Sequence, residues 1–73
     1  MNRFEKFPTW DDVLAHVAMH ECVYYHAPMD VRPVLVKAAA RGDAVRVVPF
    51  DRHADPFTAD RGHFDRFERL VKG

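Results

Sequence analysis

The stretch from Arg32 to Phe50 constrains the fold more than any other part of the chain. It reads RPVLVKAAARGDAVRVVPF, in which two strand-like runs are separated by Arg41-Gly42-Asp43. Alternation of side chains with a period of two is typical of a half-buried β-strand, and glycine supplies the positive φ that a tight turn needs. The sequence therefore predicts two antiparallel strands, 32–40 and 44–50, joined by a two-residue turn at Gly42-Asp43.

A turn at this place fixes the register of the hairpin. Ala38 then lies opposite Val47, and Val36 lies opposite Pro49. Because side chains alternate between the two faces of a strand, the register also decides which set faces the core. The apolar set is Val34, Val36, Ala38, Ala40, Val45 and Val47, which we expect on the core side, and the other face carries Leu35, Lys37, Arg46, Val48 and Phe50.

The N-terminal part of the chain has the pattern of an amphipathic helix over residues 9–20. Thr9 is suited to cap its first turn, and two aspartates follow where the helix dipole favours negative charge. The apolar residues recur at the spacing of one buried stripe: Trp10, Val13, Leu14, Val17 and Ala18. The next segment, 22–27, is rich in valine and tyrosine and ends before Pro28, which predicts a strand.

The C-terminal part shows helical spacing again. Residues 51–62 are polar and contain an Asp55-Pro56 turn signal, which favours a loop that returns Phe57 to the core. Beyond it, apolar residues recur at intervals of three or four, with charged residues between them. These apolar residues are Phe64, Phe67, Leu70 and Val71. We therefore expect a short amphipathic helix at the end of the sequence.

Taken together, these elements predict an α+β fold in one small domain over residues 1–73. A small antiparallel meander of three to four strands is flanked by an N-terminal helix and a short C-terminal helix. An SH3-like barrel is one way in which such a meander can curl. The expected core consists of Trp10, Leu14, Val17, Val36, Val45, Val47, Phe64, Phe67 and Leu70.

Charge and composition narrow the classes of function. Eleven basic and eleven acidic residues give a formal net charge of zero, so the molecule as a whole should not attract nucleic acid or anionic lipid. The apolar runs are too short to cross a bilayer, and no signal-peptide pattern opens the sequence. The only cysteine, Cys22, cannot form an internal disulfide. We expect a cytoplasmic protein without a membrane partner.

A cluster of histidines between His16 and His26, HVAMHECVYYH, raises the question of a metal site. His16 and His20 are four residues apart and would be neighbours on one helical face. However, the two-histidine, one-glutamate motif of helical zinc sites is absent, and Cys22 and His26 are about 13 Å apart along a straight strand. The sequence favours a structural role for the cluster and predicts no metal ligands.

Catalytic patterns are missing as well. Serine is absent, the three glycines form no phosphate-binding loop, and no histidine is placed as a partner for Cys22. The acidic residues between Asp51 and Asp65 lack the spacing of a calcium loop, and Arg41-Gly42-Asp43 is explained by the turn. We therefore expect neither an enzyme nor a cofactor.

Two hypotheses about function remain. The first is a noncatalytic protein-interaction or regulatory module, whose partner is another protein or a second copy of the chain in a homodimer. Its basis is the large number of aromatic residues, nine in a short chain. These residues either all fill the core or in part form an exposed interface. The alternative is a nucleic-acid-binding module that uses one sheet face for stacking and phosphate contacts. The residues of that face are Tyr24, His26, Lys37 and Arg46.

Overall fold

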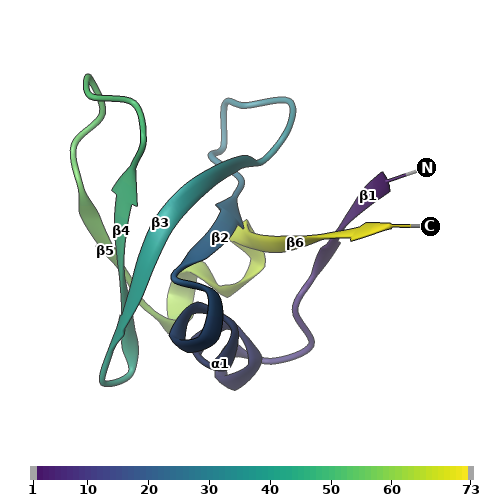
Figure 1. The fold of residues 1–73 in the computed structure, drawn as a ribbon, viewed down its shortest axis with the longest axis vertical. Helices are drawn as coiled ribbons and strands as arrows, with labels where there is room; N and C mark the ends of the chain where they lie inside the picture. Colours follow the sequence, from purple (N-terminus) through teal and green to yellow (C-terminus); the bar gives the residue numbers. More distant parts are fainter. Residues whose placement is uncertain (1, 73) are drawn as a thin grey trace.

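The computed structural model describes residues 2–72, which form an α+β fold with one α-helix and six β-strands (Figure 1). The strands are β1 (Asn2–Lys6), β2 (Cys22–Tyr25), β3 (Val34–Arg41), β4 (Ala44–Pro49), β5 (Phe57–Ala59) and β6 (Phe67–Lys72). The helix α1 spans Trp10–His20, and a short 3-10 helix, η1, spans Arg61–Arg66. Within residues 2–72, neither helix has the length and apolar character that a membrane span requires.

All six strands belong to one antiparallel sheet in the order β1-β6-β2-β3-β4-β5. Four of them, β2 to β5, follow one another as a meander, and β6 then returns to lie between β1 and β2. The sheet is not closed, because β1 and β5 remain its two edges. The predicted α+β class is confirmed, but the sheet has more strands than the three to four expected.

The hairpin formed by β3 and β4 has the predicted register. Ala38 pairs with Val47 and Val36 pairs with Pro49. Gly42 has a φ of 63°, the left-handed conformation that the turn needs. The residues that point to the core side become more exposed towards the ends of β3: Val36 and Ala38 are buried, whereas Val34 and Ala40 are exposed.

Helix α1 begins as its sequence predicts. The Thr9 hydroxyl accepts a hydrogen bond from the Asp12 amide at 3.2 Å, and Trp10, Val13 and Val17 are buried. Glu21 ends the helix with a φ of 57°, and its amide donates to the Val17 carbonyl at 2.9 Å. This left-handed residue turns the chain directly into β2, so that helix and strand are joined without a longer loop.

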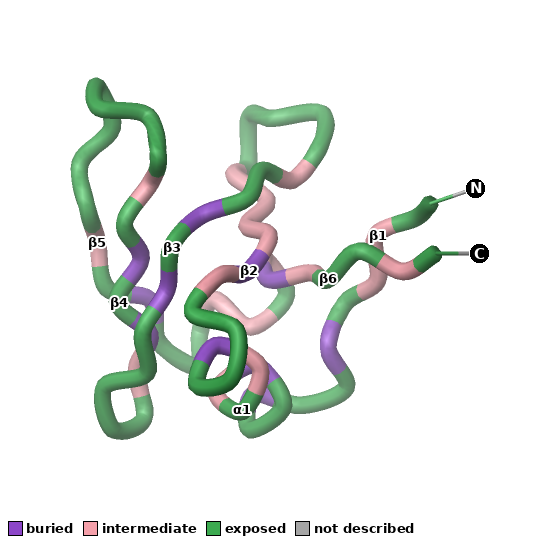
Figure 2. The backbone as a smooth tube through the Cα atoms, in the orientation of Figure 1, coloured by how far each residue is buried: buried purple, intermediate pink, exposed green. Residues whose placement is uncertain are grey.

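The core lies between α1 and the concave side of the bent sheet (Figures 1 and 2). Of the nine residues predicted for it, six are buried, Leu14 and Phe64 are half-buried against it, and the prediction for Leu70 is wrong because its side chain is 39% exposed. Edge-to-face aromatic contacts connect Trp10 with Phe67 at 5.6 Å and Phe67 with Tyr25 at 5.4 Å. The buried residues are Phe7, Trp10, Val13, Val17, Val23, Val36, Ala38, Val45, Val47, Ala59 and Phe67.

The predicted C-terminal helix is wrong. Asp60 caps the short η1 through a hydrogen bond from the Gly62 amide, and from Phe67 onward the chain is extended as β6. A helix of about eight residues is marginal by itself, whereas β6 gains backbone hydrogen bonds from strands on both sides. Tertiary pairing therefore outweighs the helical spacing. The loop expected over 51–62 likewise contains β5, which places Phe57 opposite Val47.

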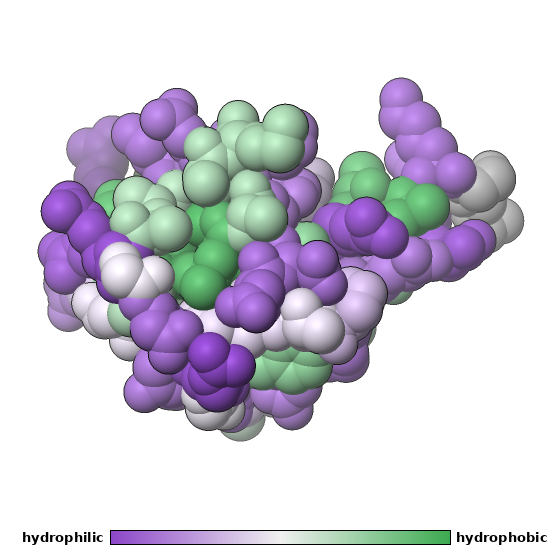
Figure 3. Space-filling model, turned by 90° about the horizontal axis from the view of Figure 1, so that it is seen from below, coloured by the Kyte–Doolittle hydropathy of each residue, from purple (hydrophilic) through white to green (hydrophobic). Residues whose placement is uncertain are grey.

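The first strand, β1, was not predicted at all. It pairs along its whole length with β6, from Asn2 opposite Lys72 to Lys6 opposite Glu68. Because only the first residues of β6 also reach β2, the rest of β1 and β6 forms a two-stranded ribbon that projects from the body (Figures 1 and 3). The Lys6 ammonium donates to the Asp65 carbonyl and ties the base of this ribbon to η1.

Candidate functional site

The two ends of the bent sheet differ in what covers them. At one end lies α1, whose Trp10 indole donates to the Asp43 carbonyl in the β3–β4 turn at 2.8 Å. At the opposite end are the β2–β3 connection, residues 26–33, and the β4–β5 connection, residues 50–56 (Figure 1). No helix covers this second end in the part of the chain that is described.

A groove of about 470 Å³ opens between these two connections. We call it the loop-end groove. Strand residues form its floor, most of them inward-facing, with Leu35 added from the outer face of β3, and the two connections form its walls. Its apolar residues are Tyr25, Ala27, Val34, Leu35, Val36, Pro49, Phe50, Ala54 and Phe57, and its charged residues are Asp30 and Asp51.

The floor of the groove continues the aromatic contacts of the core. The rings of Tyr25 and Phe57 lie 5.1 Å apart, and Tyr25 also contacts the buried Phe67. The groove is therefore the open end of the hydrophobic core, and a ligand there would contact side chains held in place by packing. Groups held in this way lose little conformational freedom on binding.

The rim exposes large apolar side chains to solvent. Phe50 is 60% exposed and Val34 is 50% exposed. Met29 and Val31, on the β2–β3 connection but outside the lining of the groove, are 92% and 95% exposed. A monomeric protein seldom gathers exposed apolar side chains at one place without a binding role.

The groove walls carry negative charge. Asp51 also shapes the β4–β5 connection, because its carboxylate accepts from the His53 amide at 2.9 Å and its carbonyl accepts from the Ala54 amide at 3.0 Å. Asp30 donates through its amide to the Ala27 carbonyl at 3.1 Å, which forms a turn in the opposite wall. An occupant with a cationic group beside an apolar side chain would match both features of the groove.

Sequence reasoning did not find this site. It assigned Phe50 and Leu35 to the outer face of the hairpin and treated residues 51–62 as a polar loop. Two signals in the sequence were available. Prolines end the strands, and Met29 and Val31 in the sequence PMDVRP belong to no helical or strand pattern that would place them in the core. Of the nine aromatic residues, all of which lie in the described part of the chain, Phe50 alone is exposed, while the others are buried or half-buried.

Three of the four residues predicted for a nucleic-acid face lie together. Tyr24, Lys37 and Arg46 are on the outer face of β2, β3 and β4, and the register makes each a diagonal neighbour of the next. His26 follows the end of β2, where its amide donates to the Arg66 carbonyl at 2.7 Å. Tyr24 is packed edge-to-face on Phe4 at 5.0 Å, and it is half-buried rather than free for stacking.

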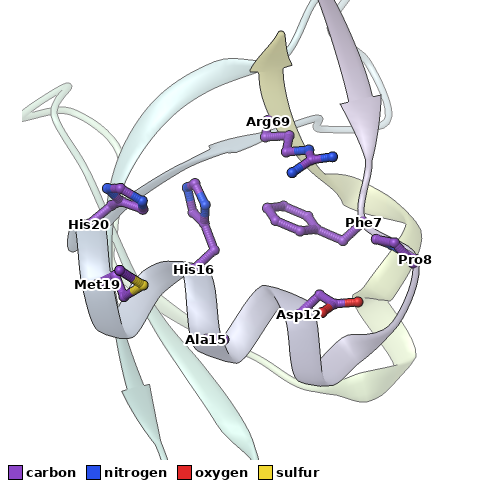
Figure 4. Close-up of a pocket in the computed structure, with 8 residues that line it drawn as sticks. All are labelled: Phe7, Pro8, Asp12, Ala15, His16, Met19, His20 and Arg69. Carbon is purple, nitrogen blue, oxygen red and sulfur yellow. The ribbon is translucent and has the colours of Figure 1, made fainter.

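The histidines of α1 line a second, shallower hollow of about 240 Å³ (Figure 4). The rings of His16 and His20 are 4.6 Å apart, and Phe7 packs on His16 at 5.2 Å. His16 is half-buried. Arg69 reaches over this hollow from β6, while Asp12 lies at its far end (Figure 4).

The surroundings of His16 disfavour its charged form. Burial, followed by the nearby His20 and Arg69, lowers the pKa of His16 below its usual value, although a backbone hydrogen bond with Cys22 acts in the opposite direction. Arg69 is itself only loosely paired, since its guanidinium lies 3.8 Å from a Glu5 oxygen. A further cation beside His16 would meet the positive charge of Arg69.

No group of three or more metal-ligating side chains is arranged around a common point within residues 2–72. His16 and His20 are adjacent as the helical spacing requires, so this hollow offers two imidazoles. The expectation that the cluster has a structural role stays a prediction.

Comparison of the chain with protein-family models, with curated proteins and with solved structures finds no match.

Proposed function

We propose that the protein is a noncatalytic interaction module that binds a partner protein in the loop-end groove. The observation that carries this proposal is the coincidence of an apolar floor, exposed apolar rim residues and two wall carboxylates at the uncovered end of the core. The partner we infer is an exposed chain segment with a large apolar side chain next to an arginine or lysine. The apolar group fills the groove, and the cation pairs with Asp30 or Asp51.

The topology indicates the type of fold on which the groove is built. Strands β2 to β5 form a meander, η1 follows, and β6 returns to pair with β2. We interpret this arrangement as an SH3-like barrel that is open between its edge strands, with α1 and β1 added at the N-terminal side. Small barrels of this kind serve many unrelated functions, so the groove and not the fold determines the proposed function.

Selection of peptides from a random library tests the proposal. We expect enriched peptides to combine a large apolar residue with an adjacent Arg or Lys. Phe50→Ser should weaken their binding at least about tenfold, equivalent to about 1.4 kcal/mol, because the ring contributes a wall of the groove. Met19→Ser is the matched control, since Met19 is 80% exposed on α1, outside the groove.

Failure of the monomeric protein to enrich any peptide, or equal loss of binding in the Phe50 and Met19 variants, would contradict the proposal. The same would hold if enriched peptides lacked basic residues and bound an Asp30→Asn, Asp51→Asn variant as tightly as the unchanged protein. In that case the wall carboxylates would have no part in recognition.

The outer sheet face supports a second candidate function, nucleic-acid binding. Lys37 and Arg46 are exposed diagonal neighbours, and no carboxylate of the described residues lies within ion-pair distance of either. Against it stand the zero net charge and the packed position of Tyr24. Two side chains can neutralise few phosphates, so the field is weak.

Titration of labelled oligonucleotides at two salt concentrations separates the candidates. We expect affinities no tighter than the nonspecific range of about 10⁻⁴ to 10⁻⁶ M at physiological salt. Submicromolar binding that weakens steeply with salt and is abolished by Lys37→Ala with Arg46→Ala would favour the nucleic-acid function instead.

A further inference from the structure

The β2–β3 connection carries the two features proposed for an occupant of the loop-end groove, a large apolar side chain and an adjacent cation. It contains Met29 and Val31, whose side chains are almost wholly exposed, and Arg32 follows Val31 directly. The Arg32 guanidinium lies over the Phe4 ring at 5.6 Å and is exposed. Among residues 2–72, no carboxylate lies within ion-pair distance of it. This is an apolar side chain beside a cation, presented at the surface.

The connection is also placed where a second molecule could use it. Its residues Ala27 and Asp30 form part of one wall of the groove, so the donor segment and the groove lie at the same end of the molecule. An interface with two-fold symmetry requires that both complementary surfaces belong to one patch of each subunit. Rotation by half a turn about an axis at this end brings the connection of each copy to the groove of the other.

We propose that a second copy of this chain is the partner, in a dimer in which each copy inserts Val31 and Met29 into the loop-end groove of the other. This inference rests on the proposed function of the groove. In the dimer, Arg32 of one copy pairs with Asp51 of the other. Two such pairs form, one on each side of the axis.

The conformation of the segment favours insertion. Pro28 and Pro33 flank it, and the hydrogen bond from the Asp30 amide to the Ala27 carbonyl closes a turn within it. Prolines reduce the number of conformations that the free segment can adopt, so less entropy is lost when it becomes fixed in the partner. The contact also removes from water the two most exposed apolar side chains among the described large hydrophobic residues.

Sedimentation of the protein over a range from about 5 µM to 1 mM measures the association, which mass action makes dependent on concentration. We expect the unchanged protein to form dimers within this range. Met29→Ser with Val31→Ser should weaken the dimer at least about tenfold, because the inserted apolar side chains are removed. Both positions are exposed, so the monomer fold should be retained, and Met19→Ser should sediment like the unchanged protein.

A charge exchange tests the pairing itself. Arg32→Glu places like charges opposite one another in its own dimer, and so does Asp51→Arg, so each variant alone should sediment as a monomer. Mixed in equal amounts, the two variants should form a heterodimer, because each new charge then faces its opposite. Two independently misfolded proteins would not regain association on mixing.

The outcomes distinguish this inference from the proposed function on which it rests. A protein that remains monomeric throughout the range, but still binds library peptides in the groove, overturns the dimer and leaves the proposed function standing. A dimer that is insensitive to the Met29 and Val31 substitutions, or charge variants that do not associate on mixing, also overturns it. If the unchanged protein neither associates nor binds library peptides, both proposals are overturned.

Discussion

The α1 end and the loop end of the sheet have similar apolar interiors but different surroundings. At the α1 end, Val13 and Val17 are 0% and 1% exposed, because the helix lies across the strands. At the loop end, Phe50 and Val34 reach water although they border the same core. Thus the side chains that a strand turns inward are buried only where another element covers them. At the uncovered loop end, a bound partner can bury these apolar side chains.

The strongest test of this contrast compares two phenylalanines. Phe67 is fully buried and contacts both Trp10 and Tyr25, so Phe67→Ala should reduce the free energy of unfolding by about 3–5 kcal/mol. Phe50→Ala, at a 60% exposed position, should change it by about 0.5 kcal/mol or less. Urea denaturation measures both values. Similar losses for the two variants would mean that the loop end is packed as tightly as the core.

A smaller effect is expected where α1 is fixed at its start. Thr9→Ala removes the acceptor for the Asp12 amide and should lower the free energy of unfolding by about 1 kcal/mol. Thr9→Ser keeps the hydroxyl and serves as the control, with most of the stability retained. Thermal denaturation would contradict the account of the helix start if the two variants had the same midpoint.

The smallest expected effect concerns pH. Because the folded state lowers the pKa of His16, the unfolded chain takes up this proton at higher pH than the folded protein does. The contribution of neutral His16 to the free energy of unfolding is complete above the usual histidine pKa of about 6.5. It is lost as the pH falls through the lower pKa that His16 has in the folded protein. His16→Gln should therefore flatten the decrease in stability on acidification below about pH 6.5.

Urea titrations of both proteins across this pH range provide the measurement. Since His20 and Arg69 contribute to the lowered pKa, Arg69→Gln should flatten the dependence in part. An unchanged slope in the His16 variant would show that other groups account for the acid sensitivity.

The sequence predicted those parts of the fold that depend on local pattern. Thr9 and the apolar stripe specify α1, and Gly42 fixes the hairpin register to the residue. The C-terminal strand could not be predicted in the same way, because Phe64, Phe67 and Leu70 have helical spacing. Residues 67–72 form a strand because they pair with β1 on one side and with β2 on the other, and both of these strands are distant from them in sequence.

The candidate groove was beyond sequence reasoning for a related reason. The alternation of β3 and β4 indicates which side of each strand faces inward, but it does not indicate which end of the sheet is covered. Phe57 was expected in the core, and it is half-buried because it borders the groove. The outer-face residues Tyr24, Lys37 and Arg46 were predicted to lie together, since their grouping follows from strand register alone.

The central claim is that the loop end is the binding surface, and amide chemical shifts test it most directly. A library-selected peptide is added to isotope-labelled protein, and the shift changes are mapped on the chain. The account predicts that they concentrate at Tyr25, Val34, Phe50, Asp51 and Phe57, while the amides of α1 stay unchanged. Changes that instead gather on α1, or around Lys37 and Arg46 on the outer face, would contradict it.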